Sequence, residues 1–312
     1  MKNRKGIIYL SLVIPCFNEE AAIPLFYEEA LKIISSINGQ TEFIFIDDGS
    51  KDNTLKILRQ LANQDRRIHY ISFSRNFGKE AAMFAGLQAA QGKYIIMLDA
   101  DLQHPPSLIP QMLEEITSDE YDCIVAKRTR KGDPLLRSFF ARCFYWVISK
   151  FTGIEITDGV GDFRLMTKNY VDAILQLEER NRFSKGFYPW IGFRTKYIEY
   201  ENVERIAGAT KWSFGELFFY SLDGIIAFST KLLSFISIIG ISTFCISVVL
   251  FILLVLRKIF LDVPVDGWTT IVCFIILFGG IIILAIGILG QYLARIYTEV
   301  KQRPHFIIRE SK

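Results

Sequence analysis

The sequence predicts an α/β protein in which a mostly parallel sheet with helices on both faces is followed by interfacial helices and two transmembrane helices. Apolar residues make up 51% of the 312 residues although 22% are charged, as expected when a soluble and a lipid-soluble part share one chain. Short apolar runs alternate with amphipathic segments in the first part, and two long uncharged stretches follow near the end.

The soluble part begins with alternating strand-like and helix-like segments. The strand-like runs are residues 7–14, 43–46, 68–73, 94–98 and 123–126. The helix-like segments are residues 22–37, 54–63, 80–90 and 108–117. This alternation indicates a mostly parallel sheet covered by helices.

Polar residues gather where four of the predicted strands end. These clusters are residues 15–20, 47–50, 74–79 and 99–101. Open α/β sheets bind ligands at the carboxyl ends of their strands, which lie along one edge. We therefore expect the clusters to form a single site.

Two stretches are long enough to cross a membrane. Residues 232–256 and 267–294 contain no charged residue, and at about 1.5 Å per residue each helix would exceed a hydrocarbon core of roughly 30 Å. A very apolar buried hairpin is the alternative, but glycines in both stretches favour membrane helices. We predict transmembrane helices at 232–256 and 269–294, joined by a short extracytoplasmic loop at 257–268.

The charges around the spans predict their orientation. The loop is neutral, whereas residues 295–312 form a basic tail, so the positive-inside rule places the tail in the cytosol. The amino terminus imitates a short signal peptide, but its apolar run continues into Pro15 and Asn18 without a small-residue cleavage site. We expect a multi-pass protein of the cell (plasma) membrane with its soluble domain and both termini cytosolic.

Two amphipathic segments complete the predicted domain organisation. Residues 134–151 combine an aromatic face with a basic face, which is typical of a helix in the membrane interface, although an ordinary packing helix is the alternative. Residues 213–231 lead into the first span as a second interfacial segment. The cytosolic domain therefore comprises residues 1–212.

A basic patch lies directly before and within the first amphipathic segment. Its members are Lys127, Arg128, Arg130, Lys131, Arg137 and Arg142, against Asp133 alone. A lipid-borne phosphate would arrive at this height, and guanidinium groups bind phosphate bidentately. Attraction of Arg130 and Lys131 to anionic headgroups is the alternative.

Composition argues against several other classes of protein. A net charge of +3 does not suit a nucleic-acid-binding protein, because a bilayer already accounts for the basic patch. The five scattered cysteines suggest neither a disulfide framework nor a zinc site. Two spans make too small a bundle for a transporter unless the protein forms a homo-oligomer.

One strand-end cluster has the character of a metal site. Asp99, Asp101 and Gln103 follow an i, i+2, i+4 spacing and offer the oxygen ligands that suit Mg²⁺ or Mn²⁺. Two carboxylates one residue apart point to the same side of an extended chain and repel unless a cation or donor lies between them. His104 precedes two prolines, and we interpret it as a turn residue stacked near the site rather than a ligand.

Six segments together resemble the inverting glycosyltransferases of family 2, whose nucleotide-binding Rossmann-like fold is termed GT-A. They are residues 13–20, 46–50, 74–80, 98–106, 161–166 and 208–212, in the order found in the family. Within the family, the sequence is most similar to polyprenyl-phosphate glycosyltransferases, the group of dolichol-phosphate mannosyltransferase and the bactoprenol glucosyltransferases. The two terminal spans also match the bactoprenol branch.

The resemblance implies roles for individual residues. Pro15, Glu19, Asp48, Lys79 and Asp99 would bind the nucleotide, with Asp48 reaching the base. Asp99, Asp101 and Gln103 would hold the metal and diphosphate, and Asp162 would be the catalytic base. The basic residues implied to bind phosphate groups of donor or acceptor are Arg128, Arg137, Arg164, Arg205 and Lys211.

The implied reaction transfers a sugar, glucose or N-acetylglucosamine, from a UDP-sugar to polyprenyl phosphate with inversion. The second pKa of a phosphomonoester is near 6, so this acceptor hardly needs a base at cytosolic pH. We therefore expect Asp162 to orient the acceptor, and a structural pairing with Arg164 is the alternative. The rival functions are a processive polysaccharide synthase, whose Gln-x-x-Arg-Trp motif is absent, and a non-catalytic sugar-nucleotide-binding membrane protein.

Overall fold

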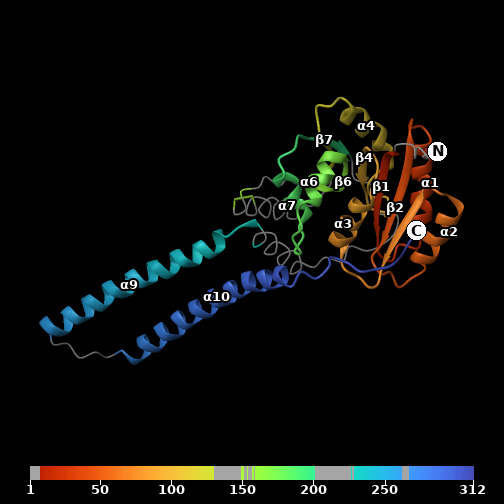
Figure 1. The fold of residues 1–312 in the computed structure, drawn as a ribbon. Helices are drawn as coiled ribbons and strands as arrows, with labels where there is room; N and C mark the ends of the chain where they lie inside the picture. Colours follow the sequence, from red (N-terminus) through yellow and green to blue (C-terminus); the bar gives the residue numbers. More distant parts are fainter. Residues whose placement is uncertain are drawn as a thin grey trace.

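An eight-stranded sheet with the order β7-β5-β6-β4-β1-β2-β3-β8 forms the centre of the soluble part (Figure 1). The computed structural model describes residues 8–129, 149–150, 153, 157, 159–200, 226, 228–261 and 267–312. Only β6 and β8 run antiparallel to their neighbours, so the prediction of a mostly parallel sheet is confirmed. The strands are β1 (Ile8–Cys16), β2 (Gln40–Asp47), β3 (Ile68–Phe73), β4 (Tyr94–Met97), β5 (Cys123–Arg128), β6 (Val160–Thr167), β7 (Thr195–Tyr200) and β8 (Ile308–Ser311).

Helices cover both faces of the sheet, as predicted. The first face packs against α1 (Ala22–Ile34), α2 (Thr54–Gln64) and α4 (Ile109–Thr117), the last preceded by the short 3-10 helix η1 (Pro106–Leu108). The second face packs against α3 (Lys79–Ala89), α6 (Lys168–Leu175) and α7 (Ser184–Trp190).

The two apolar cores follow directly from the periodicity of the sequence. In β1, Leu12 and Ile14 belong to the first core and Val13 to the second, because successive strand residues face opposite sides. In α1, Phe26 and Ala30 are fully buried at helical spacing in the first core. A sheet buried on both faces accounts for the nearly continuous apolar runs of the central strands.

Three strands were not predicted from the sequence: β6, β7 and β8. In β6, Asp162 and Arg164 alternate with the fully buried Phe163 and Leu165, so only one side of the strand is apolar. The last strand, β8, lies in residues 295–312, which we predicted as a tail. Its pairing with β3 joins segments more than 230 residues apart in sequence, which no local pattern reveals.

The carboxyl-terminal segment is tied to the sheet by stacking and charge as well as by strand pairing. The ring of Phe306 stacks on Phe73, with centroids 4.8 Å apart and an interplanar angle of 13°. Glu310 accepts hydrogen bonds from Arg59 Nε and Nη2, at 2.7 and 2.5 Å. The chain after residue 300 is thereby attached to the β3 edge of the sheet.

Replacing Phe306 by alanine is expected to lower the free energy of unfolding of the soluble domain by about 2 kcal/mol, because it removes a packed ring beside Phe73. Denaturant unfolding of the purified chain in detergent measures the change. The exposed Arg309 provides the matched control; Arg309→Ala should leave the midpoint within error. Equal effects from both substitutions would contradict the packing role of Phe306.

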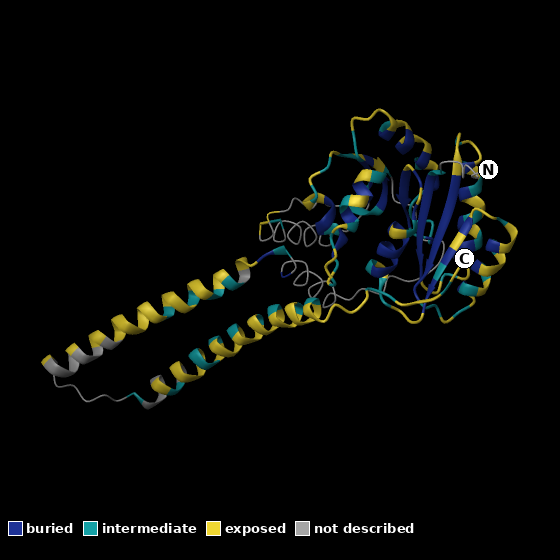
Figure 2. Cartoon of the chain, viewed as in Figure 1, coloured by how far each residue is buried: buried dark blue, intermediate teal, exposed yellow. Residues whose placement is uncertain are grey.

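Two long helices extend away from the sheet in the same direction (Figure 1). They are α9 (Lys231–Leu261) and α10 (Trp268–Val300), and they contain the predicted spans. Both are long and apolar enough to cross a membrane, and no residue of their most apolar windows is buried (Figure 2). Most of the predicted interfacial helix at 134–151 and most of the segment at 213–231 lie outside the described residues.

Candidate active site

A cavity of about 380 Å³ lies at the carboxyl ends of β1, β2 and β4. Its walls come from the four strand-end clusters that the sequence predicted would converge. The predicted site residues that line it are Pro15, Glu19, Asp48, Lys79, Asp99 and Asp101. The sheet therefore brings together residues up to 86 positions apart in the chain, from 15 to 101.

The loop after β3 is held in the cavity wall by Asp48. Its carboxylate oxygens accept hydrogen bonds from the backbone N–H groups of Phe77, at 2.6 Å, and Gly78, at 2.9 Å. Burial raises the pKa of Asp48, and the two N–H donors oppose that rise. Asp48 thus fixes the loop that carries Lys79 into the site.

The loop after β2 approaches this same segment closely at Gly49. Gly49 has a φ of +68°, and a Cβ atom there would lie 2.7 Å from Arg75 O. Glycine alone meets both requirements without strain. The Asp-Asp-Gly sequence after β2 therefore serves the packing of two site loops.

The loop after β1 is fixed to the start of α2 by backbone contacts. The N–H of Glu19 donates to Thr54 Oγ1 at 2.8 Å, and the N–H of Asn18 donates to Ser50 Oγ at 2.9 Å. Asn18 Oδ1 in turn accepts from the N–H of Lys51 at 2.9 Å. These contacts hold Pro15 and Glu19 at the rim of the cavity.

An ammonium group joins the two carboxylates to which the sequence assigned the main chemistry. Lys79 Nζ lies 2.7 Å from Asp99 Oδ1 and 2.7 Å from Asp162 Oδ2. Lys79 begins α3, Asp99 follows β4 and Asp162 belongs to β6. The predicted nucleotide-binding and catalytic residues are therefore parts of one charged cluster.

The opposite charges of this cluster stabilise the ionised form of each group. Burial alone would raise the pKa of Asp162, but Lys79, and then Arg164 and Lys185, hold it well below the usual range of an aspartate. Burial would lower the pKa of Lys79, and Asp162 and Asp99 instead raise it. Both groups are consequently ionised at neutral pH.

Arg164 lies deeper on the same side of β6 as Asp162. It is 2% exposed, its guanidinium carbon lies 3.2 Å from the centre of the Tyr188 ring, and Nη2 donates to Gly161 O at 2.8 Å. Within the described part of the chain it forms no ion pair with Asp162, which instead contacts Lys79. The structural pairing of Asp162 with Arg164 considered from the sequence is therefore not seen.

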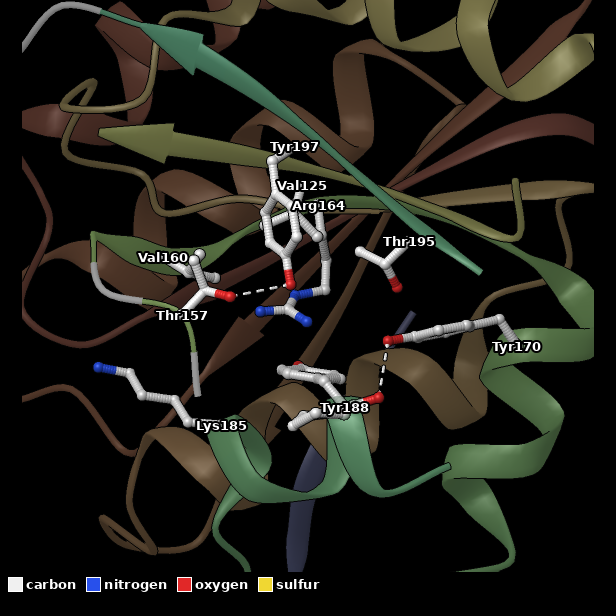
Figure 3. Close-up of a pocket in the computed structure, with 10 residues that line it drawn as sticks. Val125, Thr157, Val160, Arg164, Tyr170, Lys185, Tyr188, Thr195 and Tyr197 are labelled. Atoms are coloured by element: carbon white, nitrogen blue, oxygen red, sulfur yellow. Dashed lines mark hydrogen bonds between the residues drawn. The ribbon is translucent and has the colours of Figure 1, made fainter. Parts of the chain in front are cut away.

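A second, small cavity of about 40 Å³ opens beside Arg164 (Figure 3). Lys185, Tyr188 and Tyr197 also line it. The hydroxyl of Tyr188 is buried and has no hydrogen-bond partner among the described atoms. Sequence reasoning did not select Lys185 or Tyr188, because α7 carries no recognisable motif and meets Arg164 only through the fold.

His104 packs beside the cluster rather than projecting into solvent. Its ring centroid lies 5.3 Å from that of Phe163, and Nδ1 is 3.9 Å from Asp99 Oδ2. Burial lowers the pKa of His104, so the ring is neutral at neutral pH. A Cβ on Gly161 would come within 3.3 Å of its Nε2, so a larger residue there would require the His104 ring to shift slightly. The stacking role expected for His104 agrees with this packing.

The remaining predicted site residues lie at the margin of the described structure. Gln103 donates its backbone N–H to Asp101 Oδ1 at 3.1 Å and is not among the residues lining the main cavity, so its role as a metal ligand stays a prediction. Arg128 ends β5. Arg137, Arg205 and Lys211 lie outside the described residues.

The comparisons with known proteins identify the family. Residues 11–175 match the family model described as Glycosyl transferase family 2. The chain belongs to glycosyltransferase family 2. The resemblance inferred from the sequence is thereby confirmed, and this family 2 member is a glycosyltransferase enzyme.

Relatives match this glycosyltransferase over nearly its whole length. CsbB of Bacillus subtilis is 42% identical over 308 residues, covering 99% of this chain and 93% of its own. The SfII prophage-derived bactoprenol glucosyl transferase of Shigella flexneri is 40% identical over 303 residues, covering 97% of this chain and 98% of its own. The likeness therefore extends through α9 and α10.

Solved structures of other glycosyltransferases are more distant. Glucosyl-3-phosphoglycerate synthase from Mycobacterium tuberculosis, in complex with Mn²⁺, UDP-glucose and phosphoglyceric acid, is 19% identical with a TM-score of 0.47, covering 70% of this chain and 78% of its own. Staphylococcus aureus TarS in complex with UDP-GlcNAc is 15% identical with a TM-score of 0.47, covering 70% of this chain and 66% of its own. Likenesses this distant say nothing of the substrates of this glycosyltransferase.

Proposed function

We propose that this glycosyltransferase transfers glucose from UDP-glucose to polyprenyl phosphate at the cytosolic face of a membrane, inverting the anomeric carbon. The observation that carries the proposal is the 40% identity to a bactoprenol glucosyl transferase over 97% of the chain, with both apolar helices included. The acidic cavity with Lys79 is consistent with a nucleotide-sugar site. The relative is a bactoprenol glucosyl transferase, which favours glucose over N-acetylglucosamine as the transferred sugar.

The donor site is suited to a divalent metal. Asp99 and Asp101 both line the cavity and offer oxygen ligands, and the Asp99 carboxylate already contacts a cation, the Lys79 ammonium group. Among the described residues no group of three His, Cys, Asp or Glu side chains is placed to hold a metal ion. Two carboxylates suit Mg²⁺ or Mn²⁺, because Mg²⁺ commonly combines one or two carboxylates with substrate phosphates.

Charge neutralisation is the main demand of the reaction. When bound, the metal would offset the negative charge that develops on the departing diphosphate. Lys79 carries a second positive charge at the same place, between Asp99 and Asp162. The acceptor phosphate then needs only to be held in line with the anomeric carbon, because it attacks directly and no protein nucleophile is required.

Asp162 acts in this proposal by positioning. Its low pKa makes it a poor base at neutral pH, and the acceptor phosphate is already largely dianionic there. Through its contact with Lys79, the Asp162 carboxylate holds the ammonium group between the two substrates. Arg164 and Lys185 lie on the same side and add positive charge for the acceptor phosphate.

We expect the pH dependence of turnover to reflect the acceptor rather than Asp162. The pKa of Asp162 is depressed below the ordinary aspartate value of 3.8. Its ion pair with Lys79 is therefore fully present above pH 3.8 and is lost only as the pH falls further. The pKa of Lys79 is raised above the ordinary lysine value of 10.5. Its ion pairs are therefore fully present below pH 10.5 and are lost as the pH rises further. Steady-state rates should thus be flat between about pH 7 and 9 and fall near pH 6, where the phosphate gains a proton.

A reconstitution experiment tests the proposed function. The purified chain in nanodiscs is mixed with undecaprenyl phosphate, Mg²⁺ and, separately, UDP-glucose, UDP-N-acetylglucosamine or GDP-mannose, and lipids are analysed by mass spectrometry. UDP-glucose should give the glucosylated phospholipid, and undecaprenol without phosphate should give none. Product with a different donor alone would correct the sugar, and no product with any donor would overturn the proposal.

A further inference from the structure

A cavity of about 540 Å³ lies where α10 meets the soluble domain, apart from the donor site. Its walls come from the end of α10 and the residues that follow it, the loop before α3 with the first turn of α3, and the segment between α6 and α7. Figure 1 shows this end of α10 beside the sheet domain. We call it the α10 basic cavity.

The α10 basic cavity is lined by five basic residues and one acidic residue. The basic residues are Arg75, Arg180, Arg182, Lys301 and Arg303. The acidic residue, Glu80, is already engaged, because its carboxylate accepts hydrogen bonds from the N–H of Ser184 at 3.0 Å and from the Ser184 hydroxyl. In the described part of the chain, none of the five basic side chains forms an ion pair. Glu80 and Glu179 act electrostatically on Arg182, but the residues lining the cavity keep an excess of positive charge.

Aromatic rings hold three of these cations in place without neutralising them. Arg75 lies 4.0 Å from the ring centre of Phe77, Arg182 lies 4.2 Å from that of Phe84, and Lys301 Nζ lies 4.1 Å from that of Tyr297. Arg75 and Arg182 each donate one N–H group to a backbone carbonyl, that of Asn76 at 2.9 Å and that of Leu177. A guanidinium has five N–H donors, so further N–H groups of each can bind a planar or tetrahedral anion.

The neighbouring histidine responds to the same positive charge. His305, which also lines the α10 basic cavity, has a pKa lowered first by burial and then by Arg180 and Arg182. Burial also lowers the pKa of Arg182. One nearby carboxylate, Glu299, accepts hydrogen bonds from the backbone N–H groups of Arg180 and Asn181, at 2.7 and 3.3 Å. Glu299 thus fastens this segment to α10 through its main chain.

The position of the cavity indicates which anion it meets. The apolar window of α10 ends at Val300, and Lys301 and Arg303 follow immediately. Tyr297, one turn earlier, is 60% exposed, as is typical of an aromatic side chain at a membrane surface. Basic pockets at the cytosolic ends of membrane helices bind phosphate-bearing lipid headgroups.

We propose that the α10 basic cavity binds the phosphate group of an anionic membrane lipid. The proposal rests on the membrane orientation given under the proposed function, but not on the sugar or the acceptor. The bound phosphate would contact the loop of Arg75 and Phe77, in which the backbone N–H groups of Phe77 and Gly78 donate to Asp48 in the donor cavity. A lipid in this cavity would therefore brace the loop that carries Lys79.

The test measures lipid binding without sugar transfer. The full chain in detergent is titrated with phosphatidylglycerol or phosphatidylcholine of identical acyl chains, and bound lipid is counted by native mass spectrometry. We compare Lys301→Gln/Arg303→Gln, which changes two exposed residues of the cavity, with Lys56→Gln/Arg66→Gln, which removes two exposed charges on or beside α2. At about fivefold in affinity per basic residue, the cavity variant should bind phosphatidylglycerol about 25-fold more weakly, and the control should match the wild type.

Further arms separate the sources of the phosphate. Inorganic phosphate at millimolar concentration should not displace phosphatidylglycerol from the wild-type chain, because a headgroup held at the membrane surface has the advantage of its acyl chains. Displacement by inorganic phosphate would assign the cavity to a soluble anion and overturn the lipid proposal. Equal weakening in the cavity and control variants would also overturn it. Retained UDP binding in both variants shows that the donor site is intact, whatever the outcome for the proposed function.

Discussion

Asp162→Asn is expected to lower kcat by about 10³-fold while leaving the affinity for UDP-glucose within about threefold. The carboxylate lies 2.7 Å from Lys79 Nζ and is the deeper of the two acidic partners of that ammonium group. The amide keeps the volume but removes the charge that holds Lys79 between the substrates. Single-turnover rates with saturating donor measure the chemical step, and calorimetry with UDP-glucose measures binding.

The pH profile of the same variant separates positioning from proton transfer. If Asp162 positions Lys79, the ratio of wild-type to variant rates should stay constant between about pH 7 and 9. A ratio that changes tenfold per pH unit in this range would show that Asp162 exchanges a proton with the substrate, contradicting the positioning role. Asp172, an exposed aspartate on α6, offers a matched control, and Asp172→Asn should retain wild-type turnover.

Asp99→Asn is expected to lower kcat/KM by about 10²-fold to 10³-fold and to abolish most of the stimulation by Mg²⁺ or Mn²⁺. Asp99 contacts Lys79 through both carboxylate oxygens, at 2.7 and 2.9 Å, and shares the cavity with Asp101. An uncharged amide at this position weakens both the metal and the orientation of Lys79. Rates measured across a metal titration, with chelated protein as the starting point, report both losses.

Two comparisons make the Asp99 prediction specific. Asp101→Asn should weaken the metal response with less effect on Lys79, because the carboxylates that contact the Lys79 ammonium group are those of Asp99 and Asp162. A wild-type metal response in Asp99→Asn would contradict the assignment of Asp99 as a ligand. It would move the proposed metal site to other residues.

The sequence predicted those strands and helices that have a clear local pattern of apolar residues. Strands β1 to β5 and the first four α-helices follow apolar runs and amphipathic periods, and the strand-end clusters converge because parallel strands share an edge. Strand β6 was missed since Asp162 and Arg164 make one of its faces charged. Strand β8 was missed because its partner, β3, lies far away in sequence.

The sequence identified the residues of the candidate site but did not predict which of them contact one another. Asp99, Asp101 and Asp162 were selected from motifs, whereas the bridging position of Lys79 depends on α3, β4 and β6 meeting in space. The enclosure of Arg164 by Tyr188 likewise requires α7, which sequence patterns did not mark. Charge pairing across elements is a tertiary property, and motif spacing alone cannot give it.

The anomeric configuration of the reaction product tests the central claim most directly. UDP-glucose carries an α-linked glucose, and a single in-line displacement by the acceptor phosphate gives a β-linked polyprenyl phosphate. Nuclear magnetic resonance of the purified glycolipid, with its anomeric proton coupling, distinguishes the two forms. We expect the β-linked product alone; an α-linked product would contradict a single in-line displacement by the acceptor phosphate.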